Sequence, residues 1–172
     1  MKTLYLFLLW LPLAIVQPVT AQKSSKAAKA AQEEKAFREI QTLVNRKHFQ
    51  IKIDRVYPQS GHDVSRFNPN GKITIKDSIA EGHLPFFGRA YNLPYGEGGG
   101  IEFNAPMKDQ GIQITEKRKK KFISFHFFVP GQNDVYQINI DIVSNGGCSI
   151  NLTSNNRAHI SYSGTISAIE EQ

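Results

Sequence analysis

The sequence predicts a mostly β protein, an antiparallel meander forming a barrel or half-barrel, with one N-terminal α-helix. Between Phe49 and Ile166, apolar residues recur at every second position in several short runs, a period typical of half-buried strands. Turn-forming Gly, Pro and Asn residues separate these runs at near-regular spacing, which favours a curled antiparallel sheet. One earlier stretch has a helical period instead. These three observations predict the fold class.

The N-terminus has the pattern of a secretory signal peptide. Lys2 precedes an apolar run from Leu4 to Val16, and Val19-Thr20-Ala21 places small residues before a cleavage point after Ala21. The run is shorter than the roughly 20 apolar residues of a membrane-spanning helix. We therefore expect residues 1–21 to be removed. The mature chain would be periplasmic or secreted and would have no transmembrane segment.

The remaining chain is long enough for a single domain with its own core. Residues 22–32, QKSSKAAKAAQ, predict a flexible or frayed helical leader rich in Lys and Ala, and residues 33–172 the domain. Within the domain, the helix is predicted from Glu33 to about Lys47, because Phe37, Ile40 and Val44 share one face. We expect this helix to close one side or end of the sheet.

Period-two alternation predicts the strands that follow. They are expected at residues 49–57, 72–76, 101–103, 112–114, 122–129, 136–142, 148–153 and 157–166. Asn145-Gly146 predicts a tight hairpin between two of them. The alternation also puts Cys148, the only cysteine, on an apolar face. No internal disulfide can form, and the thiol is expected to be buried and inert.

The least ordinary segment is HLPFFGRAYNLPYGEGGGIEF, His83 to Phe103, with five aromatic residues and five glycines. One interpretation is a corner of the sheet, bent by glycines and filled by aromatic rings. The other is a rim for a small ligand, in which Arg89 donates to a carboxylate, phosphate or sugar hydroxyl. The ligand-binding residues of this second interpretation are Phe86, Phe87, Arg89, Tyr91 and Tyr95.

Other constellations of reactive residues are weak. The five histidines have no spacing known from metal sites, and no nucleophile elbow or paired carboxylate motif is present. We predict no catalytic residue, no metal and no cofactor. Much of the net charge of +6 sits in local segments such as Lys117 to Lys121. A solvated hairpin tip is the usual place for such a run, and we expect no nucleic-acid partner, although anionic lipid or glycan stays an alternative.

Two segments together resemble a known family. LPFFGRAYNLPYGEGGGIEF and NLTSNNRAHISYSGTI, with the signal peptide and the Lys/Ala-rich helix, resemble the bacterial domain-of-unknown-function family 4251 from about Ala36 to Ile166. The resemblance implies export from a Gram-negative cell and a lipocalin-like β-barrel, but no function. Val19-Thr20-Ala21-Gln22 lacks a lipobox cysteine, and the only tryptophan is Trp10. Neither a lipid anchor nor a lipid-carrier role is therefore implied.

The function predicted from these patterns is an uncharacterised exported protein, a non-catalytic binding or envelope-associated module with a small-ligand site near residues 84–95. Two alternatives stay open. One is a protein-protein interaction module whose partner, another envelope protein, adds to an exposed sheet edge. The other is a hydrolase whose site is assembled from residues distant in sequence.

Overall fold

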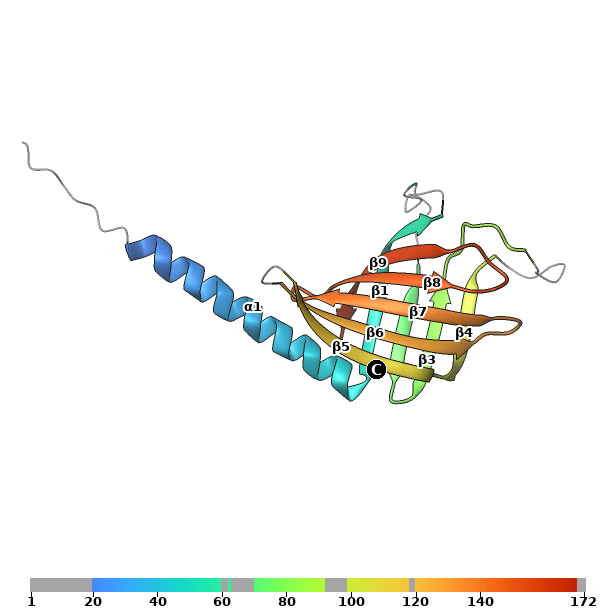
Figure 1. The fold of residues 1–172 in the computed structure, drawn as a ribbon, viewed down its shortest axis with the longest axis horizontal. Helices are drawn as coiled ribbons and strands as arrows, with labels where there is room; N and C mark the ends of the chain where they lie inside the picture. The colour runs from blue at the N-terminus through green and yellow to red at the C-terminus, as the bar shows by residue number, and fades with distance from the viewer. Residues whose placement is uncertain (1–19, 60–61, 63–69, 92–98, 118–119, 170–172) are drawn as a thin grey trace, which may run out of the picture.

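The protein is a nine-stranded antiparallel sheet that curls into a half-barrel, with one α-helix before it (Figure 1). The structure, a computed structural model, describes residues 20–59, 62, 70–91, 99–117 and 120–169. The helix is α1 (Thr20–Arg46). The strands are β1 (His48–Pro58), β2 (Lys72–Lys76), β3 (Ile79–Leu84), β4 (Ile101–Pro106), β5 (Lys108–Lys117), β6 (Lys120–Pro130), β7 (Val135–Val143), β8 (Gly147–Thr153) and β9 (Ile160–Ser167).

The strand order shows how the sheet closes on itself. It runs β4-β3-β2-β1-β9-β8-β7-β6-β5, so strands that follow one another along the chain are paired in the sheet with one exception, and the last strand pairs with the first. Only β4 and β5, joined through Met107, are adjacent in sequence without being paired. The predicted antiparallel meander in half-barrel form with one N-terminal helix is confirmed.

Strand β3 is the one described strand that the alternation did not predict. Its inward positions are Ala80, Gly82 and Leu84, and the first two are too small to give an apolar signal. Gly82 is the register partner of Phe103 on β4, and a Cβ atom on Gly82 would overlap the Phe103 ring. The ring therefore fills the space that the glycine leaves, as aromatic residues do beside glycines in curved sheets.

The core fills the inside of the half-barrel with the alternate residues of its strands. Phe49 of β1 meets Phe125 of β6 edge to face, with ring centroids 6.2 Å apart. Phe127 lies 5.1 Å from Phe125, centroid to centroid. Strands β1 to β4 form one half of the sheet, and β5 to β9 form the other. Because β1 and β6 belong to different halves, these rings hold the halves together across the interior.

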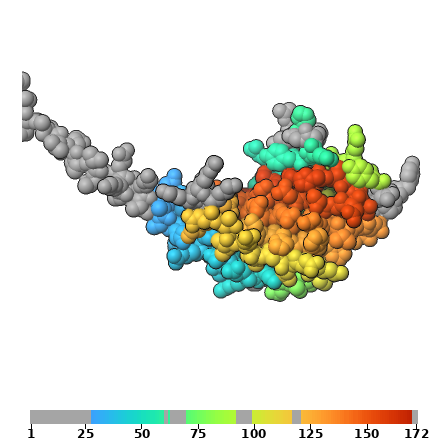
Figure 2. All heavy atoms as spheres, viewed as in Figure 1, coloured from blue at the N-terminus to red at the C-terminus, as the bar shows by residue number. Residues whose placement is uncertain are grey.

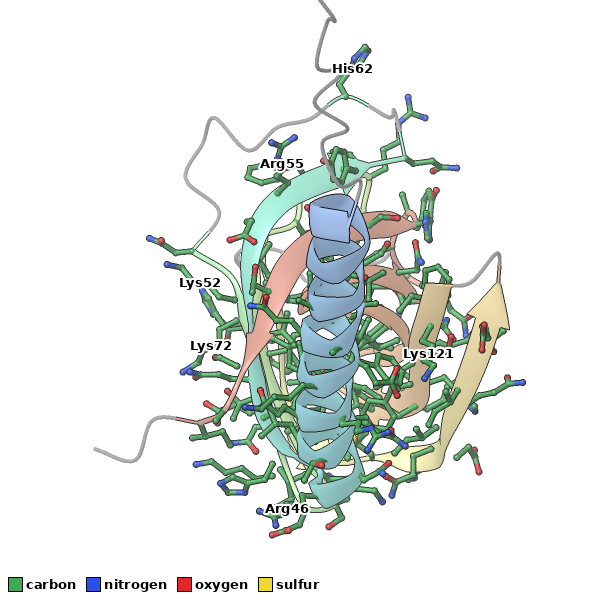
Figure 3. All side chains as sticks on the ribbon, turned by 90° about the vertical axis from the view of Figure 1, so that its left-hand side faces the viewer. Arg46, Lys52, Arg55, His62, Lys72 and Lys121 are labelled. Carbon is green, nitrogen blue, oxygen red and sulfur yellow. The ribbon has the colours of Figure 1, made fainter. Side chains whose placement is uncertain are left out.

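Helix α1 lies across one end of the half-barrel, as Figures 1 and 3 show. Phe37, Ile40 and Val44 are buried in the common core, so the predicted apolar face of the helix is the one that packs. Outside the core, Lys121 Nζ lies 2.7 Å from Glu34 Oε2 and 5.6 Å from the centre of the Phe37 ring. The bond from Lys121, with Arg38 adding to it, holds the pKa of Glu34 below its usual range. We call this end of the molecule the helix end.

The helix is longer than its periodicity indicates. It begins at Thr20 rather than at Glu33, and it includes residues 22–32, the predicted leader. Ala and Lys are strong helix formers, so the backbone continues as a helix although this part has no apolar face. The helix stops at Arg46, because Lys47 takes a positive φ of 50° and its amide donates to Val44 O at 3.0 Å.

Candidate functional site

At the end opposite the helix, residues 85–91, which we call the strap, connect β3 to the residues before β4. The strap is fixed to the turn between β8 and β9. Ala90 forms an isolated bridge with Arg157. The amide of Tyr91 donates to Asn156 O at 2.8 Å, and the amide of Ala158 donates to Arg89 O at 2.9 Å. Backbone bonds thus join two segments that are far apart in sequence, and both belong to the segments that carry the family resemblance.

The structure places four of the five predicted ligand-binding residues on this strap. Phe86 is half-buried and packs against the core. Phe87 and Tyr91 are 42% and 63% exposed, and the Arg89 side chain is exposed. Tyr95 lies outside the described residues. Of the predicted set, Phe86 therefore points inward, while Phe87, Arg89 and Tyr91 present side chains to solvent.

The buried cation of this region is Arg157, a residue that the sequence did not single out. It is only 7% exposed, and its Cζ lies 5.1 Å from the centre of the Phe86 ring. Its Nε and Nη1 have no hydrogen-bond partner in the part of the chain that the structure describes. These atoms carry three of the five N–H donors of a guanidinium group. A buried charge with unmet donors is costly, and such groups normally pair with an anion.

Tyr162, on β9, holds the start of the strap in place. Its hydroxyl donates to Pro85 O at 2.9 Å, which ties β9 to the start of the strap. Burial raises the pKa of Tyr162, and the nearby Arg157 opposes this only in part. The phenol therefore stays protonated and keeps its donor role. A further bond, from the Arg157 amide to Ser154 Oγ at 3.1 Å, fixes the turn that carries the guanidinium.

The described residues include a Ser–His contact, which bears on the hydrolase alternative. His159 Nε2 lies 3.1 Å from Ser161 Oγ, but the Ser161 hydroxyl donates to Asn151 Oδ1 at 2.8 Å. None of the ion pairs between described residues joins a carboxylate to His159. The contact is exposed, and no carboxylate of the described residues orients the imidazole, so the arrangement is not that of a catalytic triad. Nor do three His, Cys, Asp or Glu residues gather at any one place among the described residues.

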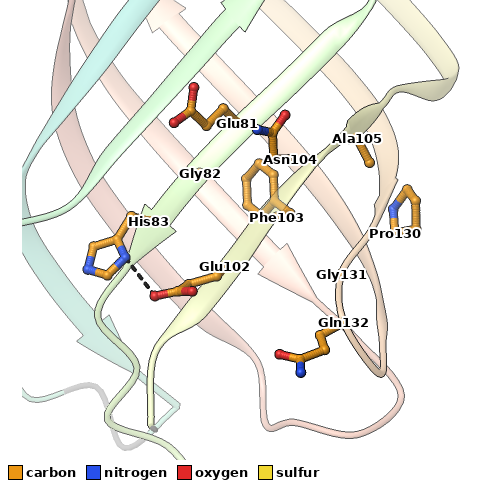
Figure 4. A pocket seen from close by; sticks show the side chains of 10 residues that line it. All are labelled: Glu81, Gly82, His83, Glu102, Phe103, Asn104, Ala105, Pro130, Gly131 and Gln132. Atoms are coloured by element: carbon orange, nitrogen blue, oxygen red, sulfur yellow. Dashed lines mark ion pairs between the residues drawn. The ribbon is translucent and has the colours of Figure 1, made fainter.

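A second concave surface lies beside β4, which is not paired with β5, the next strand along the chain. A cavity of about 610 Å³ is lined by β3, β4 and the turn between β6 and β7 (Figure 4). Its one ion pair joins His83 Nδ1 to Glu102 Oε1 at 2.9 Å, and both side chains are well exposed. Exposed pairs of this kind contribute little to binding or stability. None of the described residues that line this cavity has a buried, unpaired polar group comparable to that of Arg157.

The buried thiol gives a first testable prediction. Burial raises the pKa of Cys148 to about 12, so the thiolate fraction at pH 8 is about a thousandfold smaller than for a free thiol. We expect no reaction with a thiol-specific reagent at pH 8 while the protein is folded, and full reaction in denaturant. Labelling followed by absorbance measures this, and rapid labelling of the folded chain would contradict it.

The described helix is not apolar enough over a sufficient length to cross a membrane.

Comparisons with known proteins agree with the fold. The family model described as "Domain of unknown function (DUF4251)" matches residues 31–166. A crystal structure of a DUF4251 family protein from Bacteroides eggerthii is similar at 16% identity with a TM-score of 0.53, over 77% of this chain and 87% of that one. No curated protein matches. Because the family model covers most of its length, the chain belongs to the DUF4251 family.

Proposed function

We propose that this protein is a non-catalytic, exported binding protein that takes the anionic group of a small ligand at the strap. Arg157 is the anchor, and the observation that carries the proposal is its buried guanidinium with Nε and Nη1 unmet among the described residues. A carboxylate or phosphate supplies the acceptors that this group lacks. Export is supported by the signal-peptide pattern at the N-terminus.

The strap provides the rest of the proposed site. The Phe86 ring lies within cation–π distance of the guanidinium and helps to hold it in place. Phe87 and Tyr91 offer exposed rings at the rim, which suits a ligand with an apolar or aromatic part beside its anionic group. Arg89 adds a second, solvent-exposed cation. Tyr95 stays in the proposed set from its place in the sequence.

Replacement of Arg157 by methionine gives the sharpest test. Methionine keeps an unbranched, flexible side chain but removes a buried charge whose Nε and Nη1 have no acceptor among the described residues, so we expect unliganded Arg157→Met to be as stable as the natural protein or more stable by about 1–3 kcal/mol. Binding should nevertheless fall by about tenfold or more, because charged hydrogen bonds are lost. Phenylacetate and phenyl phosphate serve as probes, with phenylacetamide as the uncharged control. Calorimetric titration measures affinity and urea unfolding measures stability.

The opposite pattern overturns the proposal. If Arg157→Met lowers stability and leaves the binding of both anions unchanged, the guanidinium is structural. Glu97, which lies outside the described residues, provides a further control. Strong coupling between Glu97→Gln and Arg157→Met in a double-mutant cycle of stability would show that the partner of Arg157 is a carboxylate of the chain itself. Arg89→Gln, at the exposed rim, should weaken binding less than Arg157→Met.

An envelope protein that adds a strand to the sheet is the second candidate. Strand β4 ends the sheet order, and the cavity of about 610 Å³ runs beside it. An extended segment of a partner laid along β4 would have both a strand edge that no described strand pairs with and a groove. Cross-linking from a photoreactive group at Asn104 tests this, and capture of no specific envelope protein would count against it.

A further inference from the structure

The positive charge of the chain is concentrated in two segments. Residues 22–46 and 116–121 together hold eleven Lys or Arg and four Asp or Glu, a net charge of +7. The rest of residues 22–172 holds nine cationic and eleven anionic side chains, a net charge of −2. All the excess positive charge from residue 22 onward therefore belongs to α1 and to the hairpin of β5 and β6.

The fold brings these two segments to the same end of the molecule. Lys117 pairs with Lys120 and Glu116 with Lys121 where the β5–β6 hairpin turns. Lys121 then contacts Glu34 and Phe37 of α1. Figures 1 and 2 show the helix and this end of the hairpin side by side at the helix end.

Further cations belong to the same face. Figure 3 looks onto the helix end and shows Arg46, Lys52, Lys72 and Lys121 around α1. Lys52 and Lys72 are register partners on β1 and β2, and both are exposed, as is Lys29 on the helix. The cations are thus spread over a helix and three strands rather than gathered in one pocket, which suits an extended anionic surface better than a small anion.

A groove between α1 and the sheet adds an apolar element to this face. A cavity of about 810 Å³ lies there, lined by the apolar side chains of Phe37, Phe122 and Val143 and by two ammonium groups, Lys29 and Lys121, and two carboxylates, Glu33 and Glu34. Lys121 is paired with Glu34, so Lys29 is the lining ammonium group that we expect to meet a lipid phosphate, while the apolar side chains beside it suit contact with the acyl chains of a bilayer. The combination distinguishes this groove from an ordinary solvated charge run.

We infer that the helix end docks on a membrane surface that contains anionic phospholipid, with α1 against that surface. Attraction between clustered Lys or Arg residues and anionic lipid supplies the affinity. The chain order supports this partner, because the apolar run Leu4 to Val16 directly precedes α1 in the sequence. The signal peptide that we expect there would leave the helix end next to the membrane during export. Arg157 and the strap, at the other end, would then face away from the bilayer.

Sedimentation with vesicles tests the inference on the chain from residue 22 onward. Vesicles of phosphatidylcholine with 30% phosphatidylglycerol are compared with pure phosphatidylcholine, at 25 mM and 500 mM NaCl. We expect binding to the anionic vesicles only, and a loss of about tenfold or more at high salt, where the Debye length shortens to about 4 Å. Each lysine near such a surface contributes separately. The triple variant Lys29→Gln, Lys52→Gln, Lys72→Gln should therefore bind the anionic vesicles at least about tenfold more weakly than the natural protein.

Two control variants separate charge from structure. The triple Lys→Arg variant at the same positions keeps the charge and should bind within about twofold of the natural protein. Lys108→Gln removes one charge at the opposite end of the β5–β6 hairpin and should have a smaller effect than Lys72→Gln. Equal binding to neutral vesicles, binding that is insensitive to salt, or unchanged binding by the triple Gln variant would each overturn the inference. Binding to duplex DNA without binding to vesicles would do so as well.

Discussion

Gly164→Ala is expected to lower the free energy of unfolding by about 3 kcal/mol. Gly164 lies in β9 between Ile53 of β1 and Cys148 of β8. A Cβ atom there would overlap the carbonyl oxygen of Lys52 and come within 3.1 Å of Ile51 Cγ2. Because the obstacle is the backbone of the paired strand, it cannot rotate away. The two strands would have to separate at the one ladder that joins the two halves of the sheet.

A matched glycine provides the control for this prediction. Among the residues that the structure describes, the nearest atom to a Cβ on Gly99 would be Phe86 O at 3.9 Å, an ordinary contact distance. Gly99→Ala should therefore change stability by less than about 1 kcal/mol. Urea unfolding followed by circular dichroism measures both variants. If Gly164→Ala unfolds at the same urea concentration as Gly99→Ala, the close approach of β1 and β9 is not needed by the fold.

Phe125→Ala should lower the free energy of unfolding by about 4 kcal/mol, the largest effect that we expect from a single core truncation. The Phe125 side chain is fully buried and contacts the rings of both Phe49 and Phe127. Removal of the ring leaves a cavity between β1 and β6, which the curled sheet cannot close without moving a whole strand. The loss therefore combines the transfer of the ring to water with the cavity left behind.

Phe128→Ala is the natural comparison, because it removes the same ring from the other face of the same strand. Phe128 is only half-buried, so we expect less than about half the cost of Phe125→Ala. Guanidinium unfolding of both variants, fitted with a common slope, gives the difference. Equal costs would show that the outer face of β6 is as tightly covered as the inner face.

Much of the fold could be predicted because alternation is a local property. The run KITIK forms β2 with the predicted bounds, and the run from Phe49 forms β1 extended by one residue at each end. The hairpin at Asn145-Gly146 is confirmed, with the Gly146 amide donating to Val143 O at 3.0 Å. Strand β3 was not predicted because its inward glycine has no side chain, and the ring of a residue on another strand fills that space. Sequence alternation cannot reveal a side chain supplied by a neighbour.

The candidate site could be predicted only as a region. The aromatic and glycine-rich segment indicated the strap, but the sequence offered Arg89 as its cation, whereas the buried cation is Arg157. The burial of Arg157 depends on the strap that crosses it, and the contacts join residues 89–91 to residues 156–158. The one signal available was the SNNR run of the family resemblance, which identified the segment but not the burial of its arginine.

The pairing of β1 with β9 also sets how the molecule responds to force. The strands are antiparallel, and Gln50 near the start of β1 is the register partner of Ser167 at the end of β9. The chain thus enters and leaves this ladder at the same end. Tension between α1 and the C-terminus would load one pair of hydrogen bonds at a time, so that the ladder unzips instead of shearing as a unit. The protein is therefore suited to attachment through one terminus. It would unfold at low force in any assembly that pulled on both termini.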